Sequence, residues 1–207
     1  MAITHAFFDI GCVLGTNGWD RNDRKEAAAA FKIDLEEYAQ HHEEVIRPLE
    51  EGAMTLDQYL DRTVFFRPRS FTPEDFKKFM YAQSKPFPET IAIARELALT
   101  GRVRLCTASN EADELTRYRI RLFGLIGIFD TFLASCWIGV RKPAADFYHR
   151  ILAITAARAE DSVFIDDREE NVAGAKALGF HVIHFESPDQ LRRELDQVGV
   201  QLNSQTG

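Results

Sequence analysis

Residues 162–179, SVFIDDREENVAGAKALG, decide the fold class. Ser162–Ile165 forms a short apolar run with high β propensity, and Asn171–Leu178 has a helical composition that ends before Gly179. Glycine directly after a helix supplies the left-handed residue that terminates it. A buried strand that passes through two aspartates into a helix is typical of the repeating unit of a parallel α/β sheet.

Four more apolar runs of the same kind extend this pattern in both directions along the chain. They show little alternation of apolar and polar residues, as expected for strands that are buried on both faces of a parallel sheet. The five expected strands are Ile3–Phe8, Val103–Thr107, Thr131–Cys136, Ser162–Ile165 and His181–Phe185. A helical segment precedes each of the last four, at Pro88–Leu99, Ala112–Phe123, Pro143–Ile154 and Asn171–Leu178. The sequence therefore predicts an α/β fold with a doubly wound parallel sheet.

The region between the first two expected strands contains helices only. Asp23–Phe31 is alanine-rich, Thr55–Thr63 begins with a capping box, and Thr72–Gln83 begins with Thr-Pro. We expect residues 16–85 to form a helical cap, and residues 1–15 plus 86–207 to form the core domain. Such an insertion lies above the carboxyl end of the first strand, where α/β sheets bind their ligands.

The composition narrows the class of protein. The 207 residues include 25 basic and 32 acidic side chains, a net charge of −7, and 45% hydrophobic residues. This balance predicts a soluble globular chain, and it argues against binding of nucleic acid or of an anionic membrane surface. It leaves room for a local basic pocket that binds a small anion.

Cysteine usage and hydropathy indicate the cellular setting. Three cysteines with no secretory signal do not make a disulfide framework, so we expect a cytoplasmic protein. The apolar stretch Leu122–Val140 is long enough to span a bilayer, but Asp130 lies within it and Gly124 and Gly127 interrupt it. We expect this stretch to be a helix end, a loop and a buried strand.

Polar side chains follow the expected strands at four places. Asp9 follows the first strand, Ser109 and Asn110 the second, and Asp166 and Asp167 the fourth. The segment 139–143, which contains Lys142, precedes a helix. Because the carboxyl ends of parallel strands share one edge of a sheet, these groups are expected to meet in one crevice.

Four short motifs in this order resemble those of the haloacid dehalogenase (HAD) superfamily, whose core is Rossmann-like. They are FFDIGCV, LCTASNE, GVRKPAADFYH and VFIDDREENVAGAKALGF. The resemblance implies that Asp9 is the nucleophile, that Ser109 binds phosphate with Asn110 beside it, and that Lys142 is the motif's lysine. It also implies an acidic metal site at Asp166 and Asp167 and an α-helical cap after the first motif.

The chemistry of these residue types agrees with those roles. A carboxylate that attacks phosphorus forms an aspartyl-phosphate, which splits one difficult displacement into two easier steps. Mg²⁺ prefers oxygen ligands, which Asp9 and Asp167 would supply, together with the backbone carbonyl of Gly11 by resemblance. Asp166 would be a further ligand or would hold a metal-bound water. Lys142, Ser109 and the backbone N–H groups of Ile10 and Gly11 would cradle the phosphoryl oxygens, although Thr107 competes with Ser109 for its role.

One position departs from the family pattern. Most phosphatases of the superfamily have an aspartate two residues after the nucleophile, which protonates the leaving oxygen, and Gly11 stands there in this chain. Either the substrate has a good leaving group, or a cap residue such as Asp20 or His41 supplies the proton, or the enzyme is weak. Trp19 and Arg21 open the cap, where the indole could stack on a sugar ring and the guanidinium could reach a phosphate.

The sequence therefore predicts a Mg²⁺-dependent phosphohydrolase that acts on a small phosphorylated metabolite such as a sugar phosphate. Two alternatives stay open, a metal-independent haloacid dehalogenase-type hydrolase and a catalytically weak relative that binds a phosphorylated ligand or a protein. The expected oligomeric state is a monomer or a homodimer.

Overall fold

A computed structural model describes residues 2–202 of the chain. Its centre is a five-stranded, all-parallel sheet with the strand order β3-β2-β1-β4-β5. The strands are β1 (His5–Phe8), β2 (Arg104–Ser109), β3 (Thr131–Ala134), β4 (Ser162–Asp166) and β5 (His181–His184). The short central strands are almost completely buried, which explains why their sequences do not alternate.

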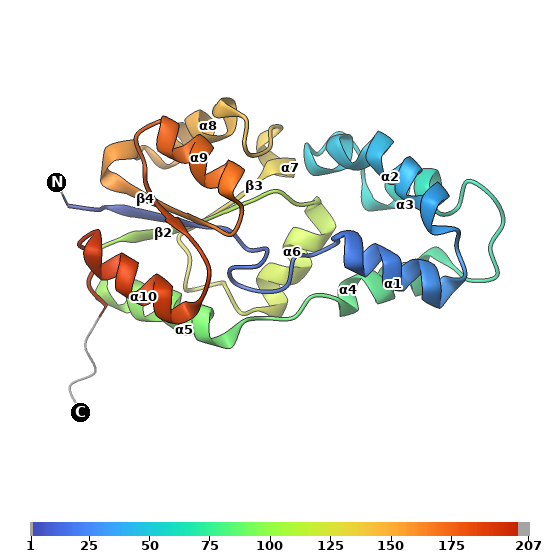
Figure 1. Cartoon of the computed structure of the whole chain (residues 1–207), viewed down its shortest axis with the longest axis horizontal. Coiled ribbons are helices and arrows are strands. Elements are labelled where there is room, and N and C mark those ends of the chain that lie inside the picture. Colours follow the sequence, from blue (N-terminus) through green and yellow to red (C-terminus); the bar gives the residue numbers. More distant parts are fainter. Residues whose placement is uncertain (1, 203–207) are drawn as a thin grey trace.

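Helices cover both faces of the sheet, as Figure 1 shows. On one face lie α5 (Pro88–Thr100) and α10 (Pro188–Gln197), and on the other lie α8 (Ala145–Thr155) and α9 (Glu169–Ala177). Each face has its own hydrophobic cluster, one centred on Phe8, Ile165 and Leu97 and the other on Phe7, Phe164 and Phe147. The expected doubly wound α/β fold is confirmed.

Four helices between β1 and α5 make a separate layer, and we call them the cap helices (Figure 1). They are α1 (Arg21–Phe31), α2 (Leu35–Glu50), α3 (Leu56–Thr63) and α4 (Pro73–Ala82). The capping box at Thr55 forms as the sequence predicts. Thr72 is the N-cap before Pro73, as expected, and it also forms a capping box with Asp75. The cap helices enclose a hydrophobic cluster of their own, which includes Tyr38, Tyr59 and Phe76.

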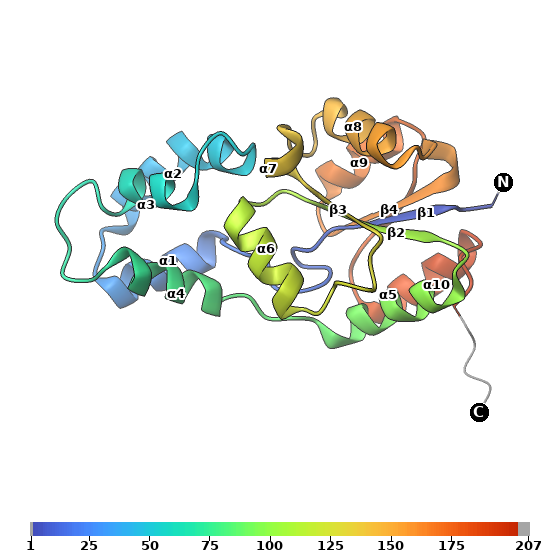
Figure 2. The ribbon, with the colours of Figure 1, turned by 180° about the vertical axis from the view of Figure 1, so that it is seen from behind.

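The contacts between the cap helices and the core include those made by one long core helix, by the short helix of residues 135–138 and by one pair of connecting segments. Ala112 and Leu115, at the start of α6 (Asp113–Leu122), belong to the hydrophobic cluster of the cap helices. Figure 2 shows α6 between the sheet and the cap helices. The segments that enter and leave the cap pair with each other, since Thr16 N–H donates to the carbonyl of Lys85 and Phe87 N–H donates to that of Leu14.

The apolar stretch Leu122–Val140 adopts the expected helix end, loop and buried strand, with one addition. Its strand is shorter than expected, because β3 ends at Ala134 and residues 135–138 form the short helix α7 (Ser135–Ile138). Asp130 fixes the loop, since its carboxylate accepts the backbone N–H of Leu105 at 2.8 Å. Within residues 2–202, no helix combines the length and the apolar character that crossing a membrane requires.

Candidate active site

The strand register brings the predicted catalytic groups together at one edge of the sheet. Phe8, the last residue of β1, pairs with Thr107 of β2 and with Ile165 of β4. Asp9 and Asp166 therefore emerge side by side from neighbouring strands. Oxygen atoms of Asp9, Asp166 and Asp167 all lie within 4.8 Å of one another.

Lys142 is the cation that faces these carboxylates. Its Nζ is buried and lies 2.6 Å from Asp166 Oδ2, 3.1 Å from Asp9 Oδ1 and 2.8 Å from the carbonyl of Ala108. Burial alone would lower the pKa of Lys142, but the two carboxylates outweigh burial and the net pKa is raised. The lysine is therefore held in its charged form between Asp9 and Asp166.

One lysine does not neutralise three acidic groups. Burial, together with the charges of Asp166 and Asp167, raises the pKa of Asp9 to about 7, although Lys142 opposes this shift. Burial and the charge of Asp166 also raise the pKa of Asp167. Carboxylates this close disfavour one another's ionised form unless a cation binds. A divalent cation fits this oxygen cluster, as the sequence predicts.

Asp166 and Asp167 differ in burial and in the protein groups that their carboxylates contact. Asp166 is fully buried, and both of its oxygens accept protein donors, from Lys142, from the backbone N–H of Arg168 and from Asn171 Nδ2. Asp167 is half-buried and lies against the Cys12 thiol. Asp166 was expected to ligate the metal or to hold a metal-bound water, and its bonds to protein donors favour an orienting role over direct ligation.

Ser109 and Thr107 lie at different distances from the crevice. Ser109 ends β2 and lines the pocket described below, whereas Thr107 Oγ1 accepts the backbone N–H of Leu133 from β3. The structure therefore favours Ser109 for contact with a phosphoryl group. Asn110 also lines the pocket, but its amide bonds the backbone N–H and carbonyl of Lys142, at 2.8 and 2.9 Å. Asn110 thus positions the lysine loop.

The backbone N–H of Ile10, in the first motif, does not have the role expected from the sequence. The N–H of Ile10 donates to Asp9 Oδ1 at 2.7 Å, so this group stabilises the Asp9 carboxylate and is not free for a phosphoryl oxygen. Gly11 lines the pocket, and a Cβ built there would lie 2.8 Å from Asn17 Oδ1. The side chain of Asn17 thus occupies part of the space beside Gly11.

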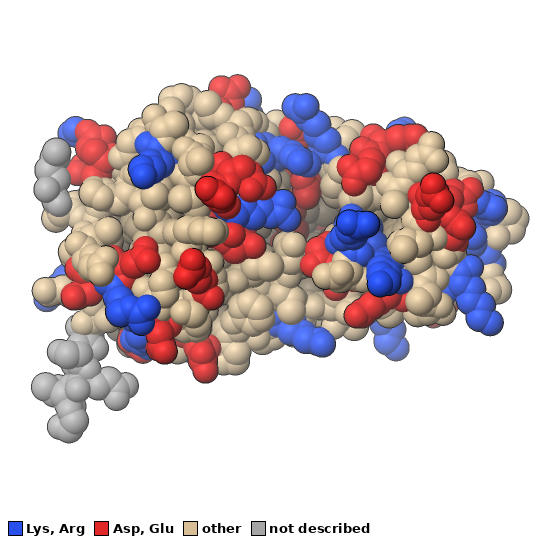
Figure 3. All heavy atoms as spheres, in the orientation of Figure 1, with Lys and Arg blue, Asp and Glu red and all other residues tan. Residues whose placement is uncertain are grey.

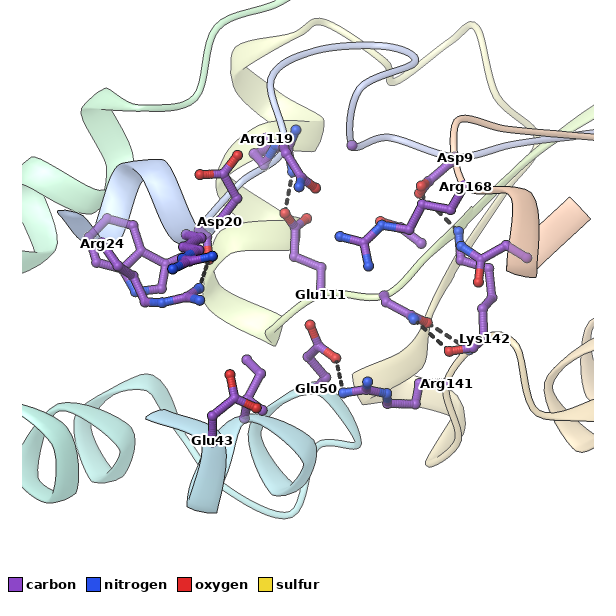
Figure 4. A pocket seen from close by; sticks show the side chains of 18 residues that line it. Asp9, Asp20, Arg24, Glu43, Glu50, Glu111, Arg119, Arg141, Lys142 and Arg168 are labelled. Carbon is purple, nitrogen blue, oxygen red and sulfur yellow. Dashed lines mark hydrogen bonds and ion pairs between the residues drawn. The ribbon is translucent and has the colours of Figure 1, made fainter. Parts of the chain in front are cut away.

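A pocket of about 330 Å³ opens over these groups, between the core and the cap helices (Figure 4). We define its floor as Asp9, Lys142 and Ser109, which line it, together with Asp166 and Asp167, which lie beside Asp9 but are not among the lining residues. We call the side chains that the cap helices and the segment before them contribute its roof. The roof consists of Trp19, Asp20, Arg21, Arg24, Glu43, Ile46 and Glu50. On the face drawn in Figure 3, acidic and basic side chains are interspersed.

Arg21 and Trp19, the two cap residues predicted to contact substrate, differ in how free their side chains are to do so. Arg21 is exposed and lines the pocket. Trp19 also lines it, but its indole N–H bonds the hydroxyls of Tyr38 and Tyr59, and its ring packs edge-on against Phe76. The expected ring for sugar stacking is therefore largely committed to the hydrophobic cluster of the cap helices.

The two candidates for a cap-borne proton donor both have other contacts. Asp20 lines the pocket but is the N-cap of α1, and its carboxylate accepts the backbone N–H groups of Asn22 and Asp23. The ring of His41 packs against Phe66 at a tilt, and among residues 2–202 His41 is not one of those that line the pocket. Its position does not favour His41 as the proton donor.

Sequence reasoning missed several charged groups of this pocket. Arg119 and Glu111 form a buried ion pair, and Arg119 also donates to the backbone carbonyl of Thr16. Arg141 of the lysine loop bonds Glu50 of the roof at 2.6 Å. Glu43 and Glu50 are seven residues apart on α2, so helical spacing was a signal that both occupy one face. Nothing in the local sequence marked Arg119.

Comparison with known proteins places the chain in a family. A profile of haloacid dehalogenase-like hydrolases matches residues 4–179. A predicted HAD-like hydrolase from Porphyromonas gingivalis superposes with a TM-score of 0.79 at 20% identity, over 97% of this chain and 100% of that one. A HAD family enzyme from Bacteroides thetaiotaomicron, in complex with magnesium and inorganic phosphate, gives a TM-score of 0.76 at 17% identity, over 89% and 95%.

Similarity to curated relatives is confined to shorter segments. A sesquiterpene phosphatase from Aspergillus oryzae is 38% identical over 58 residues, which cover 28% of this chain and 30% of the relative. Flavin mononucleotide hydrolase 1 from Arabidopsis thaliana is 35% identical over 69 residues, which cover 33% and 28%. The match thus spans less than a third of either relative. Since the profile covers most of the chain, the protein belongs to the haloacid dehalogenase-like hydrolases.

Proposed function

We propose that this protein is a Mg²⁺-dependent phosphohydrolase that cleaves a small phosphate monoester through an aspartyl-phosphate on Asp9. The observation that carries the proposal is the floor of the pocket, where Lys142 and three carboxylates converge. A sesquiterpene phosphatase and a flavin mononucleotide hydrolase among the relatives support phosphate chemistry.

The donor set at the floor suits Mg²⁺, which prefers a few carboxylates with the remaining positions left to water and phosphate. Asp9 and Asp167 would hold the ion, with the carbonyl of Gly11 as a further ligand. The ion would offset the negative charge that opposes attack of one anion on another. Asp166 would orient this assembly through its bonds to Lys142 and Asn171.

The chain's own groups supply the remaining steps. An oxygen of Asp9 attacks phosphorus, the bond from phosphorus to the leaving oxygen breaks, and a phosphoryl group remains on Asp9. Lys142 and the Ser109 hydroxyl bind the equatorial phosphoryl oxygens as their charge spreads. Water then attacks the phosphoryl group, which releases phosphate and restores the carboxylate.

The shape and polarity of the pocket favour a small polar substrate. Its volume, about 330 Å³, is at the low end of the range for ligand sites, and most of its lining side chains are charged or polar. Trp19 and Ile46 are its large apolar members. A phosphorylated metabolite with hydroxyl or acidic groups suits this lining better than a long hydrocarbon chain does. The cytoplasmic setting and the monomer or homodimer predicted from the sequence remain part of this proposal.

Phosphate release from p-nitrophenyl phosphate and a panel of sugar phosphates, measured with Mg²⁺ and with EDTA, tests the proposal. We expect release that requires Mg²⁺ and that disappears in Asp9→Asn. Halide release without metal would support the dehalogenase alternative instead. Ligand-induced thermal stabilisation without turnover would support the binding-protein alternative, which the glycine at position 11 keeps open.

A further inference from the structure

We propose that Glu50, at the C-terminal end of α2, is the proton donor to the leaving oxygen. This inference rests on the proposed phosphohydrolase function and supplies the group that Gly11 lacks. Glu50 belongs to the roof, and Figure 4 shows its carboxylate pointing from α2 into the pocket. Nothing in the sequence motifs marks it.

The geometry of in-line displacement at phosphorus limits where a proton donor to the leaving oxygen can lie. The attacking and leaving oxygens occupy opposite sides of the phosphorus atom, so the leaving oxygen points away from Asp9. With Asp9 in the floor, the leaving group faces the side of the pocket that the roof encloses. A roof side chain that reaches the leaving oxygen could therefore donate the proton that position 11 does not supply in this chain.

Each acidic roof residue, and Glu111 beside them, has a partner or is exposed, and Glu50 pairs with Arg141 through Oε2. Asp20 caps α1 through two backbone N–H groups. Glu111 is paired with the buried guanidinium of Arg119, which also bonds the backbone of Thr16. Glu43 is exposed to solvent. Glu50 combines a position in the roof with a largely buried side chain, which is 20% exposed.

The placement of Glu50 is fixed by contacts between α2 and the core. Arg141 Nη1 lies 2.6 Å from Glu50 Oε2. Two residues further on, Gly52 lies directly against α7, where a Cβ would come within 2.0 Å of the carbonyl oxygen of Cys136. Because glycine alone permits this approach, the end of α2 rests on α7, which fixes Glu50 in the wall of the pocket.

The environment of Glu50 favours a group that carries a proton. Burial raises its pKa, and the charge of Glu111 adds to this effect. Arg141, Arg168 and Lys142 act in the opposite direction, yet the net pKa stays raised. Glu43 is the other acidic residue that α2 presents to the pocket. The raised pKa lets the Glu50 carboxyl group keep its proton to a higher pH than a free glutamate does, which suits a general acid.

The proton balance closes over one turnover. As the phosphorus–oxygen bond to the leaving group breaks, the leaving oxygen takes the proton of Glu50 and departs as a neutral alcohol. The resulting Glu50 carboxylate takes a proton from the water that attacks the aspartyl-phosphate. Phosphate leaves, Asp9 regains its carboxylate, and Glu50 is again protonated.

A series of aryl phosphates with leaving groups of increasing basicity tests this role. We measure dinitrophenyl, p-nitrophenyl and phenyl phosphate with the wild-type enzyme, Glu50→Gln and Glu50→Asp. A proton donor matters most for the most basic leaving oxygen, so Glu50→Gln should lose about 10²-fold or more on phenyl phosphate and less than about threefold on dinitrophenyl phosphate. Glu50→Asp, which keeps a carboxyl group, should recover part of the phenyl phosphate activity.

Glu51→Gln is the matched control. Glu51 is the next residue, its side chain is 21% exposed, and it forms an ion pair with Arg47 of its own helix at 3.0 Å. Among residues 2–202, Glu51 is not one of those that line the pocket. This variant should keep the wild-type dependence on the leaving group. The alkaline fall of kcat/KM, caused by loss of the Glu50 proton, should be present in Glu51→Gln and absent from Glu50→Gln.

The outcomes separate this inference from the proposed function. An equal loss by Glu50→Gln across the aryl series, or no loss, would overturn the proton-donor role. Turnover that requires Mg²⁺ and Asp9 would still leave the phosphohydrolase proposal intact in that case. No phosphate release by the wild-type enzyme from any member of the series would overturn both.

Discussion

The floor and the roof of the pocket are built in different ways. The floor takes its carboxylates and Ser109 from the ends of adjacent parallel strands. Lys142, from the loop before α8, is buried and bonded to the buried carboxylates of Asp9 and Asp166. The roof takes its groups from helices that carry their own hydrophobic cluster and touch the core at few places. Floor geometry thus follows from the sheet, whereas roof geometry depends on how the cap helices dock. Substitutions in the two regions should differ in kind and in size.

The largest effect is expected from Lys142→Met. Its removal leaves Asp9 and Asp166 buried without their cation, so we expect loss of turnover and destabilisation of about 3–5 kcal/mol. Denaturant unfolding measures the second effect. The control is Arg141→Met, which breaks a partly exposed ion pair to the roof and should cost no more than about 1 kcal/mol. An equal loss in the free energy of unfolding for the two variants would contradict the difference proposed between floor and roof.

The second-largest effect is expected in the pH dependence of stability, which the buried Asp9 of the floor should dominate. The pKa of Asp9 rises from 3.8 to about 7 on folding, so between these pH values the folded state binds more protons than the unfolded state. Stability of the metal-free protein should therefore fall as pH increases through this window, by up to about 1.4 kcal/mol per pH unit. Urea unfolding at several pH values measures the slope. Asp9→Asn should flatten it, and an unchanged slope in that variant would contradict the assignment.

Much of the floor was predictable from the sequence, because strand ends in a parallel sheet have a fixed relation to one another. The positions of three apolar runs were enough to predict that Asp9, Ser109 and Asp166 lie together. Predicting that Lys142 joins them also required the motif that contains it. The N–H of Ile10 was misassigned, since its bond to Asp9 is a detail of backbone direction that residue types do not reveal.

The roof was less predictable because its residues reach the pocket only through helix packing. Trp19 resembles a ligand-binding aromatic residue in sequence, yet two buried tyrosines bond its indole N–H. Glu50 resembles a solvent-exposed residue at a helix end, yet the close approach of Gly52 to α7 buries it. Neither contact is local in the sequence, so neither could be read from helical periodicity alone.

A gain of function at Gly11 would sharpen the comparison. Gly11→Asp adds a carboxyl group near the floor, but its Cβ would lie 2.8 Å from Asn17 Oδ1, so Asn17 must move. We expect the double variant Gly11→Asp with Asn17→Ala to gain about tenfold in kcat/KM on phenyl phosphate, with the larger gain in a Glu50→Gln background. No gain in a folded variant would mean that proton donation does not limit this enzyme.

The smallest effect is expected in the roof itself. Trp19→Phe keeps the packing against Phe76 but loses the indole bonds to Tyr38 and Tyr59. Because these bonds are partly buried, we expect a loss of about 1 kcal/mol in the free energy of unfolding, measured by urea denaturation. A loss as large as that of Lys142→Met would show that the roof is as tightly built as the floor.

The most direct test of the central claim is to locate the phosphoryl group during turnover. The enzyme is mixed with p-nitrophenyl phosphate and Mg²⁺, quenched rapidly in acid, digested and analysed by mass spectrometry. Our account predicts one phosphoryl group on the peptide that contains Asp9, at Asp9 itself, and no turnover in Asp9→Asn. A phosphoryl group on another residue, or turnover retained by Asp9→Asn, would contradict it.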